Sequence, residues 1–506
     1  MSTPPAPPEL RPLPRRRVTA TGPLPEMPAS VVAERPSGPA VVEDLPPIER
    51  VPRDGRLPAT FYQQWAWETL NGEPSANLNL PFVVRFNLPV SLPVLFASLR
   101  ELERRQEGLR SRLVRAAEEP WALCQVVEPP GRLAVPLIDL TRLGPAAREA
   151  ERGRLATEDA ARPLHLTAMT MFRAQLVRLG ETDHTLLLNL CHLFGDGWSI
   201  ELLRAELAAL YTAFAAGHPS PLPELPIQFA DFAVWQRRIA AGAVVLRQLE
   251  YWRERLAAVP IPLVLQGDWP DLPRQGKGTV QSGCGFSAPV TARIRDLARA
   301  QGATTAILLL AAFGLLLSAY TGETDVVIES MVLGRLHPEL AAVVGLFINS
   351  LPHRTDLSGH PSFAEALRRT RDGVVEDYCN QDVSFPKLML ELYPGRRYLS
   401  RVAFNMLSFP TETSLETWDR EQAIFSYEGR RPDLEAPKYD LLVMGHEDRE
   451  QLRLVLVGTA ARFNEQTMAD VAADLEKLIT RALVEPGAPV AHLLPQPRYR
   501  YARPTD

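Results

Sequence analysis

The chain has 506 residues, of which 46% are hydrophobic and 23% are charged, which is enough for more than one ordinary hydrophobic core. Its net charge of −5 offers no basic surface of the kind that binds a polyanion, so nucleic acid is excluded as an expected partner. Its cysteines form no CxxC pair, so neither a zinc site nor a disulfide framework is indicated; they are Cys124, Cys191, Cys284 and Cys379.

The first 52 residues differ from the rest, because 13 of the 47 prolines lie in the first 50 positions. Proline removes backbone donors and favours extended conformers, so we expect residues 1–52 to form a proline-rich leader that is disordered or loosely docked. The leader is either a docking segment for a partner protein or a plain tail. Arginines 15–17 are not followed by an apolar run, which excludes a secretory signal.

The hydrophobic pattern gives no membrane span. The most apolar run covers residues 306–319, whereas a spanning helix needs about 20 residues. We therefore expect a buried helix there, no membrane partner and a cytoplasmic location. At the other end of the chain, residues 496–506 are basic and aromatic, and both a docking role and a solvated tail remain open for them.

The first half of the chain alternates between strand and helix patterns. Short runs of β-branched and aromatic residues predict strands at 82–86, 172–179 and 185–190. Leucines spaced by three and four residues predict amphipathic helices at 93–107 and 199–215. Prolines between 219 and 226 then interrupt the pattern.

The second half repeats this alternation, after a predicted helix that carries Trp235 and Trp252. We expect helices at 291–301, 304–320 and 362–377, a strand at 325–331, a short apolar segment at 345–351, and paired strands at 439–446 and 452–459. Two α/β halves of about 200 residues each, joined near residues 220–240, are the simplest division.

One histidine stands apart. His192 follows the predicted strand 185–190, and Ser199 is positioned to cap the next helix, so His192 lies on a strand-to-helix turn that contains two glycines. A neutral imidazole can take a proton from an incoming amine or alcohol, and nearby N–H groups can stabilise the oxyanion that forms at a carbonyl. The alternative is a hydrogen-bonded core histidine.

Neighbouring residues leave further alternatives. Asp196 could be a base, a metal ligand or half of an ion pair. Adjacent side chains on a strand leave on opposite faces, so Cys191 and His192 do not form a metal pair, and no metal is expected. The same alternation argues against Cys191 as a nucleophile and favours a buried, inert thiol.

Several segments resemble motifs of the condensation domains of nonribosomal peptide synthetases. Residues 191–199 resemble the HHxxxDG signature, which those domains share with carrier-dependent and CoA-dependent acyltransferases. Seven further segments resemble other motifs of the family, given in brackets, and occur in the family's order, one before the signature and six after it. They are 105–113 (RHExLRTxF), 229–235 (YxDYAVW), 251–252 (YW), 334–340 (GRxxPEL), 344–352 (GxFxNTLPLR), 380–385 (HQDxPF) and 438–441 (KFDL).

The resemblance covers residues 55–495 and implies an α/β fold. It implies two chloramphenicol-acetyltransferase-like lobes in a pseudo-dimeric V arrangement, with a tunnel between them. The N-terminal lobe would cover residues 53–225 and the C-terminal lobe residues 226–495, with the leader and the tail outside both.

The resemblance also implies roles within the signature. His192 matches the catalytic histidine, which positions or deprotonates the acceptor's nucleophile, and Gly197 would lend its N–H near the reacting carbonyl. Asp196 would be structural and paired with Arg335, because both members of a pair buried beside a tunnel are needed. Cys191 stands where the family has its first histidine, and that position is mainly a scaffold for the turn.

Four more residues are expected at the substrate tunnel. Trp198 and Ser199 continue the signature, and Asn349 and Ser350 would lie across the tunnel in the second lobe. For Asn349 and Ser350 the alternative is a hydrogen bond at the edge of a helix or strand, without a substrate role.

The implied function is that of a stand-alone condensation enzyme, joining a carrier-bound acyl or peptidyl thioester to an amine or hydroxyl acceptor. No bound cofactor is expected, because the substrates would be carried on the phosphopantetheine of partner carrier proteins; the acceptor could be carrier-bound or free, and the chain a monomer. One alternative is a non-catalytic platform that recruits a partner enzyme or a carrier. Another is an epimerase, which would need an additional acid at the tunnel.

Overall fold

The structure is a computed structural model that describes residues 45–494 except for 87–88, 117–121, 132, 168–170, 258, 260–262, 264, 266, 269–277, 397, 408–438 and 448–450. Residues 1–44 of the predicted leader and the predicted tail at 496–506 lie outside the described residues, as does Lys438 of the KFDL-like segment.

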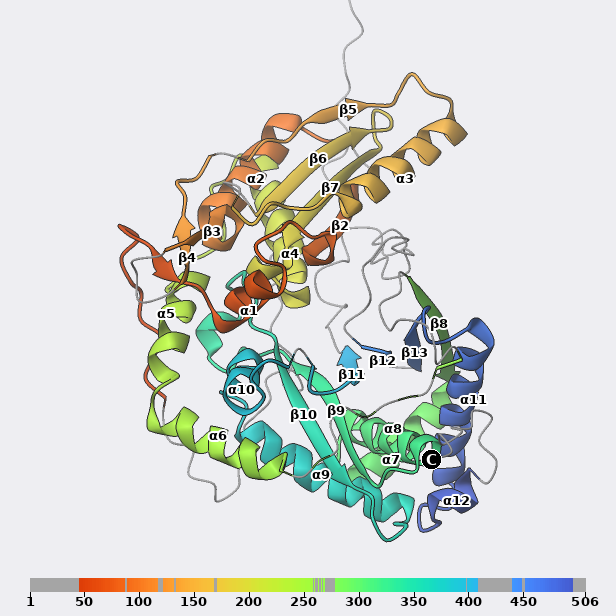
Figure 1. The fold of residues 1–506 in the computed structure, drawn as a ribbon. Helices are drawn as coiled ribbons and strands as arrows, with labels where there is room; N and C mark the ends of the chain where they lie inside the picture. Colours follow the sequence, from red (N-terminus) through yellow and green to blue (C-terminus); the bar gives the residue numbers. More distant parts are fainter. Residues whose placement is uncertain are drawn as a thin grey trace, which may run out of the picture.

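The N-terminal lobe is built on a four-stranded sheet in the order β2-β7-β6-β5, in which β5 and β6 are parallel and the other pairs antiparallel. The strands are β2 (Asn79–Phe86), β5 (Leu137–Asp139), β6 (Phe172–Arg178) and β7 (His184–Cys191). Helices α2 (Leu92–Arg105) and α4 (Gly197–Ala215) pack on the side of Leu188, and α3 (Pro145–Ala161) covers the side of Leu187 (Figure 1). Because both faces are covered, every residue of β7 is buried.

A smaller sheet, β1-β4-β3, lies beside this lobe and leads into the first helix. Its strands are β1 (Leu57–Pro58), β3 (Ser111–Arg115) and β4 (Leu123–Val127). Helix α1 (Phe61–Thr69) begins at a capping box, in which the Gln63 N–H donates to the Thr60 hydroxyl and the Thr60 N–H donates to the Gln63 side chain. This cap fixes the direction in which α1 leaves the sheet.

The C-terminal lobe contains a six-stranded mixed sheet in the order β10-β9-β11-β12-β13-β8. Its strands are β8 (Thr279–Phe286), β9 (Asp325–Val332), β10 (Asn349–Asp356), β11 (Val402–Leu407), β12 (Leu441–Glu447) and β13 (Leu452–Thr459). Its helices are α7 (Ala288–Ala300), α8 (Thr305–Thr321), α9 (Phe363–Cys379), α10 (Phe385–Leu392), α11 (Glu465–Ala482) and α12 (Val490–Leu493). Of these, α8, α9 and α11 pack on the sheet, so this lobe has a core of its own.

Two helices connect the lobes. Helices α5 (Phe229–Ile239) and α6 (Ala243–Arg255) run down one side of the molecule, and the lobes spread apart on the other side (Figure 1). The boundary between the lobes at 225/226 stays a prediction. It assigns α5 to the C-terminal lobe, whereas α5 packs against β1 of the N-terminal lobe.

The last residues of the predicted leader have a defined place. Residues 45–52 lie along α5, where the Pro46 carbonyl accepts a hydrogen bond of 2.6 Å from the Trp235 indole and the Val51 N–H donates to Asp231 at 2.8 Å. Leu45 and Ile48 pack against the core. Residues 45–52 therefore follow the docked alternative and not the disordered one, because an extended, proline-rich segment keeps its carbonyl acceptors and its apolar side chains.

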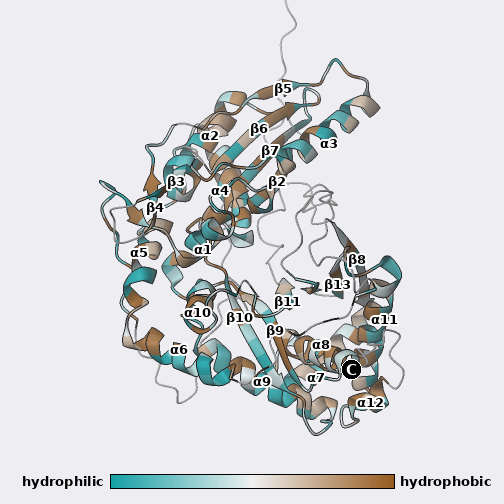
Figure 2. Ribbon diagram, viewed as in Figure 1, coloured by the Kyte–Doolittle hydropathy of each residue, from teal (hydrophilic) through white to brown (hydrophobic). Residues whose placement is uncertain are grey.

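The apolar run at 306–319 is confirmed as a buried helix. Helix α8 is mostly hydrophobic (Figure 2), and most of its residues are buried in the C-terminal lobe. Within the described residues, no single helix meets the length and apolarity that a membrane span requires; α7 and α8 do so only as a pair, and that pair is bent by 94°.

Most predicted strands and helices are present in the structure. They correspond to β2, β6, β7, β9, β12, β13, α2, α4, α7, α8 and α9. The helix predicted to carry Trp235 and Trp252 is two helices, because the chain breaks at Gly242, the N-cap of α6. The apolar segment at 345–351 is mostly loop, and β10 begins at Asn349. Two α/β lobes are confirmed.

Candidate active site

His192 occupies the turn between β7 and α4. The strand ends at Cys191, a short 3₁₀ turn covers His192–Phe194, and α4 begins at Gly197. The His192 side chain is half-buried, and its Nδ1 lies 2.9 Å from the Gly195 carbonyl oxygen. A carbonyl can only accept, so Nδ1 carries the proton and the neutral ring keeps Nε2 as its basic nitrogen. The turn thus holds an imidazole in the tautomer that a general base requires.

Gly195 leaves room for the end of the Leu190 side chain. A Cβ at residue 195 would lie 2.2 Å from Leu190 Cδ2, so any other residue would require that side chain to move. Gly197 is the first residue of α4, where N–H groups have no partner within the helix. The helix therefore directs its positive end toward the turn that carries His192.

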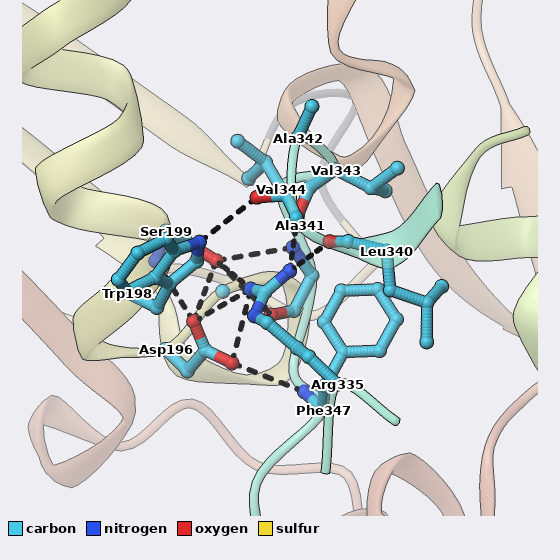
Figure 3. A network of polar contacts seen from close by, with 12 residues as sticks. Asp196, Trp198, Ser199, Arg335, Leu340, Ala341, Ala342, Val343, Val344 and Phe347 are labelled. Atoms are coloured by element: carbon cyan, nitrogen blue, oxygen red, sulfur yellow. Dashed lines mark hydrogen bonds and ion pairs between the residues drawn. The ribbon is translucent and has the colours of Figure 1, made fainter. Parts of the chain in front are cut away.

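Asp196 is the N-cap of α4 and the centre of a buried network (Figure 3). Its Oδ1 accepts from the Ser199 N–H at 2.8 Å, from the Ser199 hydroxyl at 2.7 Å and from Arg335 Nη2 at 3.0 Å. Its Oδ2 accepts from the Phe347 N–H at 3.2 Å and from Arg335 Nη2 at 3.3 Å. A carboxylate with this many donors is a structural anion and not a base.

The ion pair predicted between Asp196 and Arg335 is therefore present. Both side chains are at most 1% exposed, and burial lowers the pKa of the Arg335 guanidinium while the Asp196 carboxylate opposes that shift. Arg335 also donates to the Leu340 carbonyl at 2.5 Å and the Val343 carbonyl at 2.8 Å, and lies over the ring of Phe347. The pair joins the His192 turn of one lobe to the 335–347 segment of the other.

Trp198 and Ser199 reinforce the same contact. The Trp198 indole donates to the Ala341 carbonyl at 2.9 Å, and the Ser199 hydroxyl accepts from the Gly345 N–H at 3.1 Å (Figure 3). Trp198 is 2% exposed and Ser199 is fully buried. The prediction that they line a substrate tunnel needs correction, because the first turn of α4 is packed against the 341–345 segment and offers neither side chain to a substrate.

Asn349 and Ser350 begin β10 and are both buried. The Asn349 amide donates to the Gln381 and Val383 carbonyls at 3.0 and 2.8 Å and accepts from the Phe385 N–H at 2.7 Å, which ties β10 to the start of α10. These hydrogen bonds agree with the alternative given for Asn349 in the sequence analysis, which is a structural role at the edge of a strand. It also lines a pocket between the lobes, together with Thr60, Tyr62, Phe232, Trp235, Gln236, Gly334, Leu336, His337, Leu346, Phe347, Ile348, Gln381, Asp382 and Ser384.

Gln106 is a site residue that the sequence did not identify. Its side-chain amide donates to the Ala342 carbonyl at 3.0 Å, and its oxygen accepts from the Val344 N–H at 2.9 Å. It also donates to the buried carboxylate of Glu206. Gln106 lies in the segment that resembles RHExLRTxF, so the motif marked the position but not the contact across the lobes.

Cys191 belongs to the core and not to the reacting groups. Its side chain has no exposed surface, and burial raises the pKa of the thiol to about 12. This environment matches the inert thiol predicted from the sequence. Among the described residues, no group of three or more His, Cys, Asp or Glu side chains is arranged to hold a metal ion.

We expect Cys191 to resist alkylation in the folded protein, because only a thiolate reacts and this one is both buried and protonated. Iodoacetamide treatment at pH 8, followed by peptide mass spectrometry, should leave Cys191 unmodified until the protein is unfolded in guanidinium. Cys379, which is only partly buried, is the internal control and should be labelled faster. Rapid labelling of Cys191 in the folded state would contradict its assignment to the core.

Comparisons with known proteins agree with the two-lobe fold. The family model described as "Condensation domain" matches residues 53–499. A linear gramicidin synthase of Brevibacillus parabrevis is 36% identical over 462 residues, which cover 89% of this chain and 9% of that protein. The chain thus spans a small part of that relative's length.

Solved structures give the same agreement. The X-domain in its complex with OxyB from teicoplanin biosynthesis superposes with a TM-score of 0.74 at 26% identity, covering 89% of this chain and 98% of that one. A variant of the starter condensation domain of rhizomide synthetase RzmA has a TM-score of 0.69 at 16% identity, covering 86% and 96%, which is a likeness of fold alone.

Proposed function

The chain belongs to the condensation-domain family, and from that premise we propose that it is an acyltransferase which joins a carrier-bound acyl or peptidyl thioester to an amine or hydroxyl acceptor. The observation that carries the proposal is the state of His192: half-buried, with Nδ1–H fixed on the Gly195 carbonyl and Nε2 as the basic nitrogen. The relatives named above include a linear gramicidin synthase, and the resemblance of residues 191–199 to the signature of carrier-dependent acyltransferases supports a thioester donor on a carrier protein.

In this proposal the acceptor's nitrogen or oxygen attacks the thioester carbonyl while His192 Nε2 takes the proton from its N–H or O–H bond. The N–H groups at the start of α4, with Gly197 first among them, stabilise the oxyanion of the tetrahedral intermediate. The carbon–sulfur bond then breaks, and the imidazolium returns its proton to the leaving thiolate of the phosphopantetheine arm. The products are an amide or ester and a free carrier thiol.

The test is acyl transfer itself. A donor carrier protein loaded with an acyl-phosphopantetheine is incubated with the chain and a panel of amines and alcohols, and intact-mass spectrometry follows both the carrier and the product. We expect the acyl mass to leave the carrier and to appear on an acceptor, at a rate that depends on the chain's concentration. Unchanged carriers over the whole panel would overturn the proposal.

A second candidate is a platform that recruits a partner protein. Its support is that the X-domain likeness includes a complex with OxyB, and that Cys191 replaces the first histidine of the signature. This candidate predicts that the chain captures a partner synthetase or oxygenase from the same producer, with a dissociation constant that the His192→Ala replacement does not change, while no donor and acceptor pair condenses.

A further inference from the structure

A buried glutamine on α1 contacts the turn that carries His192. Helix α1 packs against His192–Phe194 and lies beside α4 (Figure 1), and the Gln63 amide nitrogen donates to the Leu193 carbonyl at 3.0 Å. Leu193 is the residue after His192. The Gln63 side chain is fully buried, so solvent does not compete for this hydrogen bond. The amide therefore joins the first helix of the chain to the candidate active site, 130 positions away.

The turn depends on support from outside. It is a single 3₁₀ turn of three residues, and such turns have poorer hydrogen-bond geometry than an α-helix. The Gly195 carbonyl, which accepts from His192 Nδ1 at 2.9 Å, follows directly after it. Because one residue separates Leu193 from Gly195, a rotation of the Leu193 peptide also moves the Gly195 carbonyl. A hydrogen bond that fixes the first carbonyl therefore restricts the second.

The Gln63 amide is itself held in one orientation. Its oxygen accepts from the Thr60 N–H at 2.9 Å, while the backbone N–H of Gln63 donates to the Thr60 hydroxyl at 3.2 Å. The reverse orientation of the amide would bring its oxygen against the Leu193 carbonyl and its NH₂ group against the Thr60 N–H. The capping box thus gives the amide its direction as well as starting the helix.

The start of α1 is in turn fixed to α5, which connects the lobes. The Phe61 N–H donates to the Gln236 side-chain oxygen at 3.1 Å, and Arg237 Nε donates to the Ala59 carbonyl at 2.8 Å. The guanidinium carbon of Arg237 lies 4.0 Å from the centre of the Phe61 ring. Gln63 therefore reaches the turn from a helix whose first residues are anchored on one side by α5.

We propose that Gln63 is a positioning residue, which acts through the Leu193 carbonyl to hold His192 with its proton on Nδ1 and with Nε2 as the base. This inference rests on the proposed function. Proton transfer requires Nε2 within hydrogen-bond reach of the acceptor, and a misplacement of about 1 Å can slow a reaction about 10²-fold. Gln63 should therefore affect kcat and leave the binding of the acceptor unchanged.

The first test is Gln63→Met, which keeps the unbranched shape of the side chain and removes both of its hydrogen bonds. We expect kcat for acyl transfer to fall about 10–100-fold, with KM for the acceptor unchanged within about twofold. The matched control is Gln125→Leu. Gln125 is also fully buried and donates to a backbone carbonyl, that of Pro58 at 2.9 Å, but it lies in the small sheet. This variant should keep kcat within about twofold of the wild type.

The tautomer of His192 is a readout that a general loss of stability does not move. In protein labelled with ¹⁵N-histidine, a fixed neutral tautomer shows one protonated and one unprotonated ring nitrogen, whereas exchange between tautomers averages the two shifts. The spectrum of His192→Asn identifies the signals by their absence. We expect the fixed Nδ1–H form in the wild type and in Gln125→Leu, and averaged shifts in Gln63→Met.

Gln63→Glu is the second variant and covers the case that Gln63→Met does not fold. Its carboxyl keeps an acceptor oxygen for the Thr60 N–H, but it can donate to the Leu193 carbonyl only while it carries its proton. Its kcat relative to the wild type should therefore fall as the pH rises from about 6 to about 9.

An unchanged tautomer in Gln63→Met, an equal loss of kcat in Gln125→Leu, or wild-type kcat for Gln63→Glu at pH about 9 would overturn the inference. If the tautomer responds as expected but the wild type transfers no acyl group, the proposed function fails while the assignment of Gln63 to the His192 turn stands.

Discussion

His192→Ala is expected to remove acyl transfer almost completely while the protein remains folded. General base catalysis contributes about 10²–10⁴-fold to a rate, and no other described group of the turn can replace it, because Asp196 is fully engaged as an acceptor. The half-buried ring makes one hydrogen bond among the described residues, to the Gly195 carbonyl, so the loss of stability should be about 1 kcal/mol. Single-turnover transfer from a loaded carrier and thermal unfolding measure the two effects separately.

A second replacement separates proton transfer from the shape of the turn. Asparagine at 192 can still donate an N–H toward the Gly195 carbonyl but has no basic nitrogen, so His192→Asn should lose as much activity as His192→Ala. His218→Ala, at an exposed histidine after α4, is the matched control and should keep wild-type turnover. If the asparagine variant retained the wild-type rate, the imidazole would not be the base.

The confirmed elements are those whose own residues determine their structure. Helix α8 is apolar at most positions, and β7 carries the apolar run 186–188 because both faces of its sheet are covered. Strands β3, β4 and β8 were missed because their pattern depends on the partner strand. In β8, for example, half-exposed and exposed positions alternate at the edge of the sheet, and Gly283 is required because a Cβ would lie 2.5 Å from the Leu454 carbonyl oxygen.

The same distinction applies to the candidate site. The turn from Cys191 to Ser199 is contiguous, so its strand end and its glycines could be predicted from the sequence. The helix cap was predicted at Ser199 and is Asp196 instead, because the Asp196 carboxylate accepts from the Ser199 N–H inside the first turn of α4. The contacts of Gln106 with Val344 and of Tyr62 with Ser350 join residues more than 230 positions apart, and no local pattern encodes them. Trp198 was placed at the tunnel because it continues the signature, and that motif does not say which segment of the other lobe covers its side chain.

Asp196→Ala is expected to lower the free energy of unfolding by about 3–5 kcal/mol, because it leaves the Arg335 guanidinium buried without a counterion. It also removes the N-cap of α4 and the acceptor of the Phe347 N–H. Turnover should fall with it, since the cap of α4 defines the turn that holds His192. Urea unfolding of Asp196→Ala, of Arg335→Met and of the double variant gives the coupling energy between the two side chains directly.

The double variant distinguishes a charge effect from a general loss of packing. If the cost of Asp196→Ala comes from the uncompensated cation, replacing Arg335 as well should recover part of it, and the two losses will not add. The matched control is Asp325→Ala, which breaks the ion pair with Arg354; both of these side chains are about a quarter exposed, so the cost should stay below about 1 kcal/mol. Two results would contradict this explanation: losses of unfolding free energy that add strictly for Asp196→Ala and Arg335→Met, or a loss for Asp325→Ala as large as that for Asp196→Ala. Either result would mean that burial of the Asp196–Arg335 pair is not what joins the two lobes at the His192 turn.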